Sequence, residues 1–296
     1  MGEGDVEMAS NQRNYFIRSI TVRNVLFWII LAILLLGVLF PILWLFSNSF
    51  KNRMEVYKIP PTWIPKEPTL QAYKNVIAGV EQSTPWPLFI GNSIIVGVST
   101  SVFATFLASL AGYGFARFRS KGMDAFLIVI LFALMLPGPV IIIPLAIIIQ
   151  RMGLYDKLFG LILTHTALVL PFLTWLSVGN FRAIPPNLEE AALLDGCTRM
   201  QAFIRIVLPM ARVGLATSTI FSFLISWGEY PFALILLGTR EHFTVPLGLA
   251  TYITEFNTWW DQLAVASLIT LIPVLIILSI AHQHIRRGIL AGATKG

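Results

Sequence analysis

The sequence predicts an all-α integral membrane protein with six transmembrane helices and a folded loop between the fourth and the fifth. Three observations predict this fold class. Of 296 residues, 56% are hydrophobic and 12% are charged, whereas soluble domains carry about 25% charged residues. Six long segments are almost free of charge, and helix start and stop signals fill the loop 182–212. Because a backbone in lipid has to satisfy its own hydrogen bonds, each apolar segment is predicted to be a helix.

The predicted spans are 24–50, 82–116, 125–150, 158–181, 213–239 and 262–285. Each reaches the roughly 20 residues that cross a hydrocarbon core of about 30 Å. The fifth is interrupted only by Glu229. The first exceeds the usual apolar region of a secretory signal, about 7–15 residues, and lacks an Ala-x-Ala cleavage site. It is therefore interpreted as an uncleaved span, and 25–285 as the six-span domain.

The net charge of +6 is explained by membrane orientation and requires no nucleic acid, because basic residues concentrate on the cytoplasmic side. With the amino terminus inside, 13 Lys and Arg lie in cytoplasmic segments and 8 outside, 5 of these in the long first outer loop 47–91. Both termini are therefore predicted to be cytoplasmic, as segments 1–24 and 286–296. Residues 1–20 are expected to be disordered.

The first outer loop is rich in proline and predicts extended, turn-rich chain with one short helix around 70–77. In the second span, small residues recur every four positions, which predicts close packing of a central helix.

The third span contains Pro137, Gly138, Pro139 and Pro144. Each proline removes a backbone hydrogen bond, so this helix is predicted to bend. Pro137 and Pro139 either line a translocation path or mark a kink accommodated by packing.

Polar side chains inside two spans are candidate pathway or interhelix groups. His165 lies within the fourth span, and a stripe on the fifth comprises Ser218, Ser222, Ser226 and Glu229. A charge in the membrane costs about 2.5–3.5 kcal/mol on insertion scales. The stripe is therefore expected to face the path or a partner permease, or to form a hydrogen bond between helices.

The loop 182–212 predicts two short helices joined at a glycine. Asn187, with Glu190 three residues later, is the predicted N-cap of the first helix. Gly196 fits the left-handed position that ends it, Thr198 with Gln201 forms a capping box for the second, and Pro209 is expected to stop that helix. Leu188, Ala191 and Ala192 on the first helix, and Ala202, Phe203 and Ile206 on the second, form the expected partner-facing surfaces. The alternative, a helix pair lying on lipid, is disfavoured because the carboxylates would repel anionic headgroups.

The loop also carries a motif that resembles a known family. The pattern Glu190-Ala191-Ala192, three residues, Gly196, nine residues, and the run from Ile206 to Pro209 resembles the signature of permease subunits of binding-protein-dependent ABC importers. The resemblance implies the type I importer permease architecture, with a cytoplasmic coupling helix that docks on an ATPase subunit. The coupling residues implied are Glu189, Glu190, Ala191, Ala192, Asp195, Gly196, Ile206, Leu208 and Pro209.

Further motifs are similar to the carbohydrate branch of this family, and in particular to smaller permeases of maltose transporters. They are the segments 112–117, 227–230, 244–249 and 291–296. One departure is Gly228, where relatives usually carry Asn. The resemblance implies that the last outer loop, 239–261, contacts the binding protein. It also implies an ATPase-contacting tail with Gly292, Thr294, Lys295 and Gly296.

The resemblance implies a non-catalytic subunit of a bacterial or archaeal cytoplasmic membrane. Its implied partners are a second permease, two ATPase subunits, an extracytoplasmic binding protein and lipid. The chain lacks a phosphate-binding loop of the Gly-x-x-x-x-Gly-Lys-Ser/Thr type, so ATP and Mg belong to the ATPase subunits. We find no metal-ligand spacing, and Cys197 is the one cysteine. The expected cargo is a sugar, an oligosaccharide or a sugar or glycerol phosphate. The alternatives are an importer of another solute, such as a polyamine, or a stand-alone secondary carrier.

Overall fold

The computed structural model describes residues 3–80, 84–118 and 122–293. These residues form helices joined by turns, and the one β feature among them is an isolated bridge between Ile253 and Thr258. The predicted all-α fold is confirmed. Four helices are long and apolar enough to cross a membrane, or up to six if each of two bent pairs is one span.

The four long helices are α1 (Glu3–Ser49), α4 (Trp86–Arg117), α7 (Leu158–Arg182) and α14 (Trp260–Ala293). The expected disorder of residues 1–20 is wrong, and the last helix is longer than the predicted span. Residues from Glu3 onward belong to α1 instead of a disordered segment, and α14 extends through the predicted tail as far as Ala293. In both cases the helix continues beyond the apolar run, because a helix satisfies its backbone hydrogen bonds in water as well as in lipid.

The third span is broken as predicted. It consists of α5 (Met123–Phe132), the 3-10 turn η1 (Ala133–Met135) and α6 (Gly138–Arg151). The two halves bend by 99°. Pro137 is the N-cap of α6, with extended backbone. Its ring fixes φ and it has no N–H to donate, so the first half ends before it.

The fifth predicted span is not one continuous helix. It comprises α11 (Arg212–Gly228) and the short α12 (Pro231–Leu236), with Glu229 in extended conformation between them. Pro231 has no N–H to donate to the carbonyl four residues earlier, so the hydrogen-bond ladder of α11 does not continue through it. The uninterrupted span predicted over 213–239 is therefore corrected.

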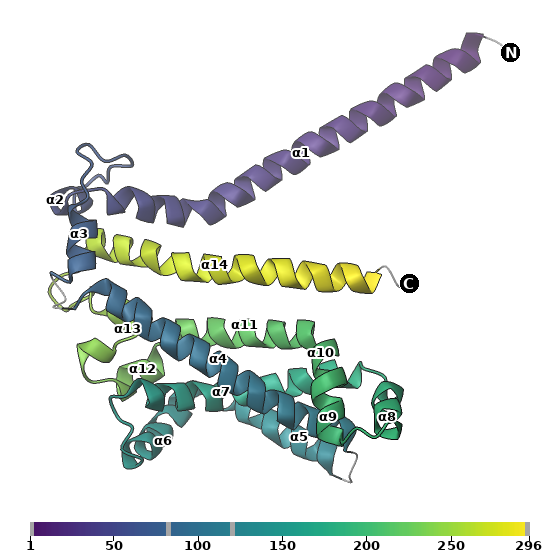
Figure 1. Ribbon diagram of the computed structural model, residues 1–296. Coiled ribbons are helices and arrows are strands. Elements are labelled where there is room, and N and C mark those ends of the chain that lie inside the picture. The colour runs from purple at the N-terminus through teal and green to yellow at the C-terminus, as the bar shows by residue number, and fades with distance from the viewer. Residues whose placement is uncertain (1–2, 81–83, 119–121, 294–296) are drawn as a thin grey trace.

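Helix α4 is central, as its small residues predict. It packs against α7 and α11 (Figure 1). A Cβ added at Gly112 would lie 2.5 Å from the Ser177 Cβ of α7, and one at Gly97 would lie 2.8 Å from the ring of Phe223 on α11. The absence of a side chain at these two positions permits the close approach of the three helices.

The connecting elements gather at the two ends of the bundle (Figure 1). One end carries α2 (Arg53–Val56), α3 (Gln71–Ala78), η3 (Arg240–His242) and α13 (Val245–Ala250). The other carries α8 (Pro186–Leu194), α9 (Arg199–Ala202), the π-helix η2 (Phe203–Val207) and α10 (Leu208–Met210). The expected short helix of the first outer loop is confirmed as α3, whereas α2 was not predicted.

Candidate functional site: a helical segment anchored to the membrane bundle

The segment from α8 to α10, residues 186–210, is folded by local signals. Helix α8 begins with Pro186 at its first position and Pro185 as N-cap, so the prediction of Asn187 as N-cap is wrong. Proline is favoured at this first position because its missing N–H has no partner there in any case. Gly196 has φ +89°, and Cys197 N–H donates to the Ala192 carbonyl at 3.0 Å. This Schellman motif ends the helix as the sequence predicts.

The second half of the segment is longer than predicted. Thr198 and Gln201 form the expected capping box at the start of α9. The chain then continues through the π-helix η2, where Leu208 N–H donates to the Phe203 carbonyl. Pro209 lies inside α10 and does not stop the segment; the break comes at Ala211. The bend between 199–210 and α11 is 77°.

One face of segment 186–210 packs onto the membrane helices. Phe203 and Val207 join a buried cluster with Tyr113 of α4 and Phe181 of α7. Ala202 is also fully buried. The expectation that Ala202 and Phe203 face a partner is therefore wrong, because these side chains fill the interface between the segment and its own bundle.

A buried ion pair fastens α8 to α4. The Nε of Arg117 donates to Glu189 Oε2 at 2.8 Å, and its Nη2 donates to the Ile184 carbonyl at 3.0 Å. The Tyr113 hydroxyl donates to the other carboxylate oxygen of Glu189. The side chains of the ion pair are only 9% and 6% exposed. Because a buried charge is costly unless it is paired and hydrogen-bonded, this arrangement strongly favours one position of α8. We call Tyr113, Arg117 and Glu189 the anchor.

The anchor changes the interpretation of one predicted coupling residue. Glu189 points into the protein, so its carboxylate does not face a docking partner. The spacing along α8 indicates this burial. Glu189 lies three residues before Ala192, so the two share one face of the helix, and Ala192 is also buried. The sequence did not show that Tyr113 and Arg117 receive Glu189, since these residues are more than 70 positions away.

The opposite face of the segment is exposed. Leu194 is 89% exposed, and Met200 and Ile204 are each more than half exposed. Glu190, Ala191, Asp195 and Gly196 are also exposed, as are Leu188 and Pro209, whereas Ala192 is buried and Ile206 and Leu208 are half-buried. The predicted coupling residues therefore divide into an outward set and an inward set. The outward face carries apolar side chains with carboxylates beside them.

The candidate polar groups within the spans come together at the break of the fifth span. His165 Nδ1 lies 2.7 Å from Ser226 Oγ, and His165 Nε2 lies 3.1 Å from Glu229 Oε2. The carboxylate of Glu229 also accepts the N–H groups of Phe232 and Ala233, at 2.8 and 3.2 Å. Glu229 thus binds the donors left open at the start of α12 and joins them to α7.

The positions of the serine stripe fit the interhelix alternative within this chain. Ser218 and Ser222 are fully buried within this chain, and Ser226 is 5% exposed. They lie where α11 packs on α4 and α7. Small hydroxyl side chains permit this close packing. Pro137 is exposed at the bend of the third span, and Pro139 lies in the first turn of α6.

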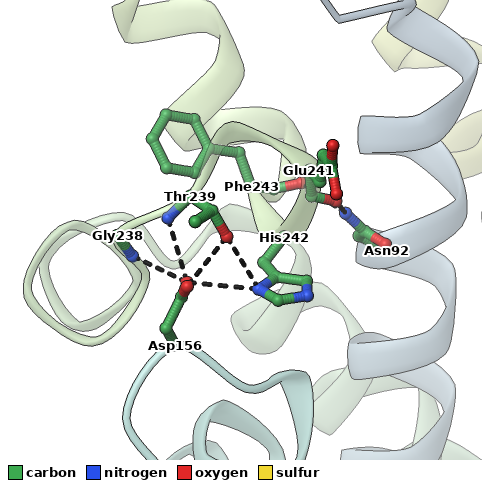
Figure 2. Close-up of polar contacts among 7 residues, drawn as sticks. All are labelled: Asn92, Asp156, Gly238, Thr239, Glu241, His242 and Phe243. Atoms are coloured by element: carbon green, nitrogen blue, oxygen red, sulfur yellow. Dashed lines mark hydrogen bonds and ion pairs between the residues drawn. The ribbon is translucent and has the colours of Figure 1, made fainter.

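At the other end of the bundle, Asp156 holds the last loop in place (Figure 2). Its Oδ1 accepts the N–H groups of Gly238 and Thr239 at 2.8 and 3.0 Å, and its Oδ2 accepts the Thr239 hydroxyl at 2.8 Å. His242 Nδ1 lies 3.2 Å from Oδ1. Asn92 of α4 donates to two carbonyls of the same loop, at 2.7 and 3.0 Å. Sequence analysis did not identify Asp156 or Asn92.

The hydrogen bonds to Asp156 also set its ionisation. Burial acts to raise the pKa of this carboxyl, but the bonds from Thr239, Gly238 and His242 outweigh burial and lower the pKa from 3.8 to about 2. A group whose pKa is lowered by folding stabilises the fold above its unfolded pKa. The contribution of Asp156 is therefore fully present above about pH 4 and is lost as the pH falls through about 2.

Among the described residues, no group of three or more His, Cys, Asp or Glu side chains could hold a metal ion. Gly292 lies in the last turn of α14. The other predicted tail residues, Thr294, Lys295 and Gly296, lie outside the described residues. The fold and the site define a helical, multi-span membrane protein with an anchored segment that presents one exposed face.

The comparisons with known proteins place this architecture in a family. The family model described as "Binding-protein-dependent transport system inner membrane component" matches residues 104–291. The chain belongs to this family. It is therefore the permease component of a binding-protein-dependent ABC importer, a multi-pass inner membrane protein and a non-catalytic part of the importer.

Two relatives match along most of their length. The chain is 33% identical to the "Inner membrane ABC transporter permease protein YcjP" of Escherichia coli, over 98% of this chain and all of that protein. It is 33% identical to the "Diacetylchitobiose uptake system permease protein DasC" of Streptomyces coelicolor, over 90% of this chain and 95% of that protein. The fold is similar to a chain in the crystal structure of a bacterial ABC transporter involved in alginate import. The TM-score is 0.74 at 23% identity, over 90% of this chain and 97% of that chain.

We predict that Arg117→Met loosens segment 186–210, because it leaves the Glu189 carboxylate buried without its cation. Removal of one partner of a buried pair costs about 3–5 kcal/mol. Hydrogen exchange of the amides in 186–210 is expected to accelerate at least about tenfold, which corresponds to about 1.4 kcal/mol or more of local stability.

The matched control is Arg212→Met, which removes an exposed arginine at the same end of the bundle. The double variant Arg117→Met with Glu189→Leu removes both charges and is expected to recover most of the protection. Unchanged exchange in Arg117→Met would show that the anchor does not hold the segment.

Proposed function

We propose that this chain forms one half of the translocation pathway of a carbohydrate importer, with a second permease subunit as the other half. Two ATPase subunits complete the importer, and one of them docks on the outward face of segment 186–210. The observation that carries this docking assignment is the division of the segment into two faces. One face is tied to the bundle by the anchor, and the other exposes Leu194, Met200 and Ile204 beside Glu190.

The outward face has the composition of a docking surface. Leu194 and Met200 are exposed apolar side chains on a helix pair outside the membrane. Their burial against a partner is favourable because it removes apolar surface from water. Glu190 and Asp195 lie beside these apolar groups, where they favour a basic rim on the partner. The predicted contact of the tail, from Gly292 to Gly296, with the ATPase subunits is part of the same proposal.

The orientation follows from the charges. We place both termini and segment 186–210 on the cytoplasmic side, because 13 of the 21 Lys and Arg then lie inside. The amino-terminal end of α1 and the carboxyl-terminal end of α14 point toward the same end of the molecule as α8 and α9 (Figure 1). ATP is cytoplasmic, so this placement puts the outward face within reach of the ATPase subunits.

In this mechanism the chain converts a movement of the ATPase subunits into a change in the side of the membrane to which the pathway opens. Closure of the ATPase subunits on ATP and Mg moves the outward face, and the anchor passes the displacement to α4. Because α4 packs on α7 and α11, the three helices move together, and the pathway alternates between inward-open and outward-open states. The chain itself supplies no catalytic group.

The opposite end is suited to receive the binding protein. Asp156 and Asn92 hold the loop 239–243 in one conformation (Figure 2). A loop that is ordered before binding loses less conformational entropy when a partner docks. We therefore assign the last outer loop, 239–261, as a contact for the loaded binding protein.

The carbohydrate assignment rests on a relative. The Streptomyces relative, at 33% identity over nearly its full length, is an uptake permease for diacetylchitobiose. We propose a di- or oligosaccharide as the cargo of this chain.

We predict that Leu194→Asp and Glu190→Lys each disrupt ATPase docking without unfolding the chain. Both side chains are exposed, so the substitutions break no internal contact. Co-purification of the ATPase subunits with the permease pair is expected to fall at least about tenfold, the equivalent of about 1.4 kcal/mol. The matched control is Glu67→Lys, a charge reversal at an exposed residue of the first outer loop. Undiminished co-purification and undiminished cargo-stimulated ATP turnover would contradict the docking assignment.

We predict that the cognate binding protein recognises a saccharide. In thermal-shift titrations, di- and oligosaccharides are expected to raise its Tm by several degrees, because a ligand that binds only the folded state stabilises it. Polyamines and amino acids serve as the comparison set. A shift with spermidine or putrescine and none with any saccharide would refute the carbohydrate assignment while leaving the docking assignment intact.

A further inference from the structure

A polar cavity lies where α4, α5, α7 and α8 meet, at the end of the bundle that carries segment 186–210. Its volume is about 760 Å³. Two arginines line it, Arg117 at the end of α4 and Arg182 at the end of α7, together with Asp124 in the first turn of α5. Phe115 and Phe118 supply apolar wall. Because Arg117 is already paired with Glu189, Arg182 is the guanidinium group that this cavity offers to an anionic group, and the aromatic walls suit an apolar body attached to it.

A second cavity continues from the first along the membrane helices. It has a volume of about 220 Å³ and lies between α5 and α7, with Leu127, Trp175, Leu176 and Gly179 among its lining residues. Arg182 lines both cavities. Trp175 is seven residues before Arg182, so the groove reaches about 10 Å along α7 away from the polar end. An amphipathic ligand would therefore place its polar group at Arg182 and its hydrocarbon toward Trp175.

We propose that these two cavities form a binding site for one aminophospholipid of the adjoining leaflet. Its phosphate diester binds Arg182, its primary ammonium group binds Asp124, and one acyl chain lies in the groove beside Gly179. The site is separate from the translocation mechanism, and its occupant is part of the membrane that surrounds the chain.

The charges at the polar end match this headgroup. Arg182 Nη2 lies 2.7 Å from Asp124 Oδ1, and the two side chains are 51% and 82% exposed. An exposed ion pair of this kind contributes only about 0–1 kcal/mol, so its rearrangement costs little. A guanidinium group has five N–H donors in a planar fork and binds phosphate bidentately. The Arg182–Asp124 pair therefore presents one cation and one anion to a headgroup that carries one of each.

The groove has space for a chain because of Gly179. A Cβ added at Gly179 meets no heavy atom within 4 Å. Gly179 is itself one of the residues that line the groove. The open face of α7 at Gly179 therefore lies toward the groove, and a large side chain there would fill the groove without a clash inside the protein.

Native mass spectrometry of the assembled complex, purified in detergent, tests the proposal with three probes. These are phosphatidylethanolamine, phosphatidylglycerol and inorganic phosphate. The wild-type complex is expected to retain one phosphatidylethanolamine at least about tenfold more strongly than phosphatidylglycerol, and inorganic phosphate is not expected to compete. Gly179→Leu is expected to remove retention of both lipids, and Arg182→Gln to reduce it at least about tenfold, or about 1.4 kcal/mol. Asp124→Asn is expected to abolish only the preference between them.

The controls are Gly91→Leu, at another helical glycine with open space around its Cβ position, and Arg212→Gln, at an exposed arginine of the same end. Size-exclusion chromatography checks that each variant complex assembles. Three results would overturn the proposal: lipid retention that is unchanged in Gly179→Leu, competition by inorganic phosphate alone, or efficient cross-linking of a cysteine at position 179 to the second permease. Equal retention of the two lipids would overturn the assignment of the ammonium group to Asp124.

Discussion

The buried ion pair between Arg117 and Glu189 is the constraint on which the rest of this structure depends. A segment of about 25 residues lies between α7 and α11. Among the described residues, it is attached to the bundle by the anchor, by the apolar cluster around Phe203 and by the contact of Arg199 with the Phe118 ring. An unpaired carboxylate at this depth would be costly. The charge of Glu189 therefore favours a single docked position of α8, and this position gives the opposite face its defined exposure.

Two carboxylates serve the backbone on either side of α12 in the same way. Asp156 collects two backbone N–H groups and a hydroxyl from the last loop, and Glu229 caps α12 while it contacts His165. In each case one carboxylate satisfies the donors of an interrupted backbone. Breaks at proline are tolerated in the third and fifth spans, and in the fifth this carboxylate satisfies the donors that the break exposes. Glu229 and Asp156 thus connect α12 and the last loop to the neighbouring helices.

Sequence analysis predicted the features that depend on local signals. The left-handed Gly196, the capping box at Thr198 and the bend before Pro137 follow from residue chemistry within a few positions. It failed where partners come from distant helices. Glu189 was assigned to a docking surface because nothing nearby in the sequence shows that Tyr113 and Arg117 enclose it. For the serine stripe, periodicity showed a face but not what covers it, so the path, the partner permease and the interhelix contact stayed open as alternatives.

The most direct test is whether segment 186–210 and α4 move as one body during ATP turnover. Spin labels at Arg205→Cys and Phe106→Cys, both exposed positions outside the proposed docking residues, in a Cys197→Ser background, report the distance between them by electron-electron double resonance. In the assembled complex, the distance is predicted to change by less than about 2 Å between nucleotide-free and ATP-bound states. A larger change with the anchor intact would contradict the account, because the segment would then move independently of the helix to which it is tied.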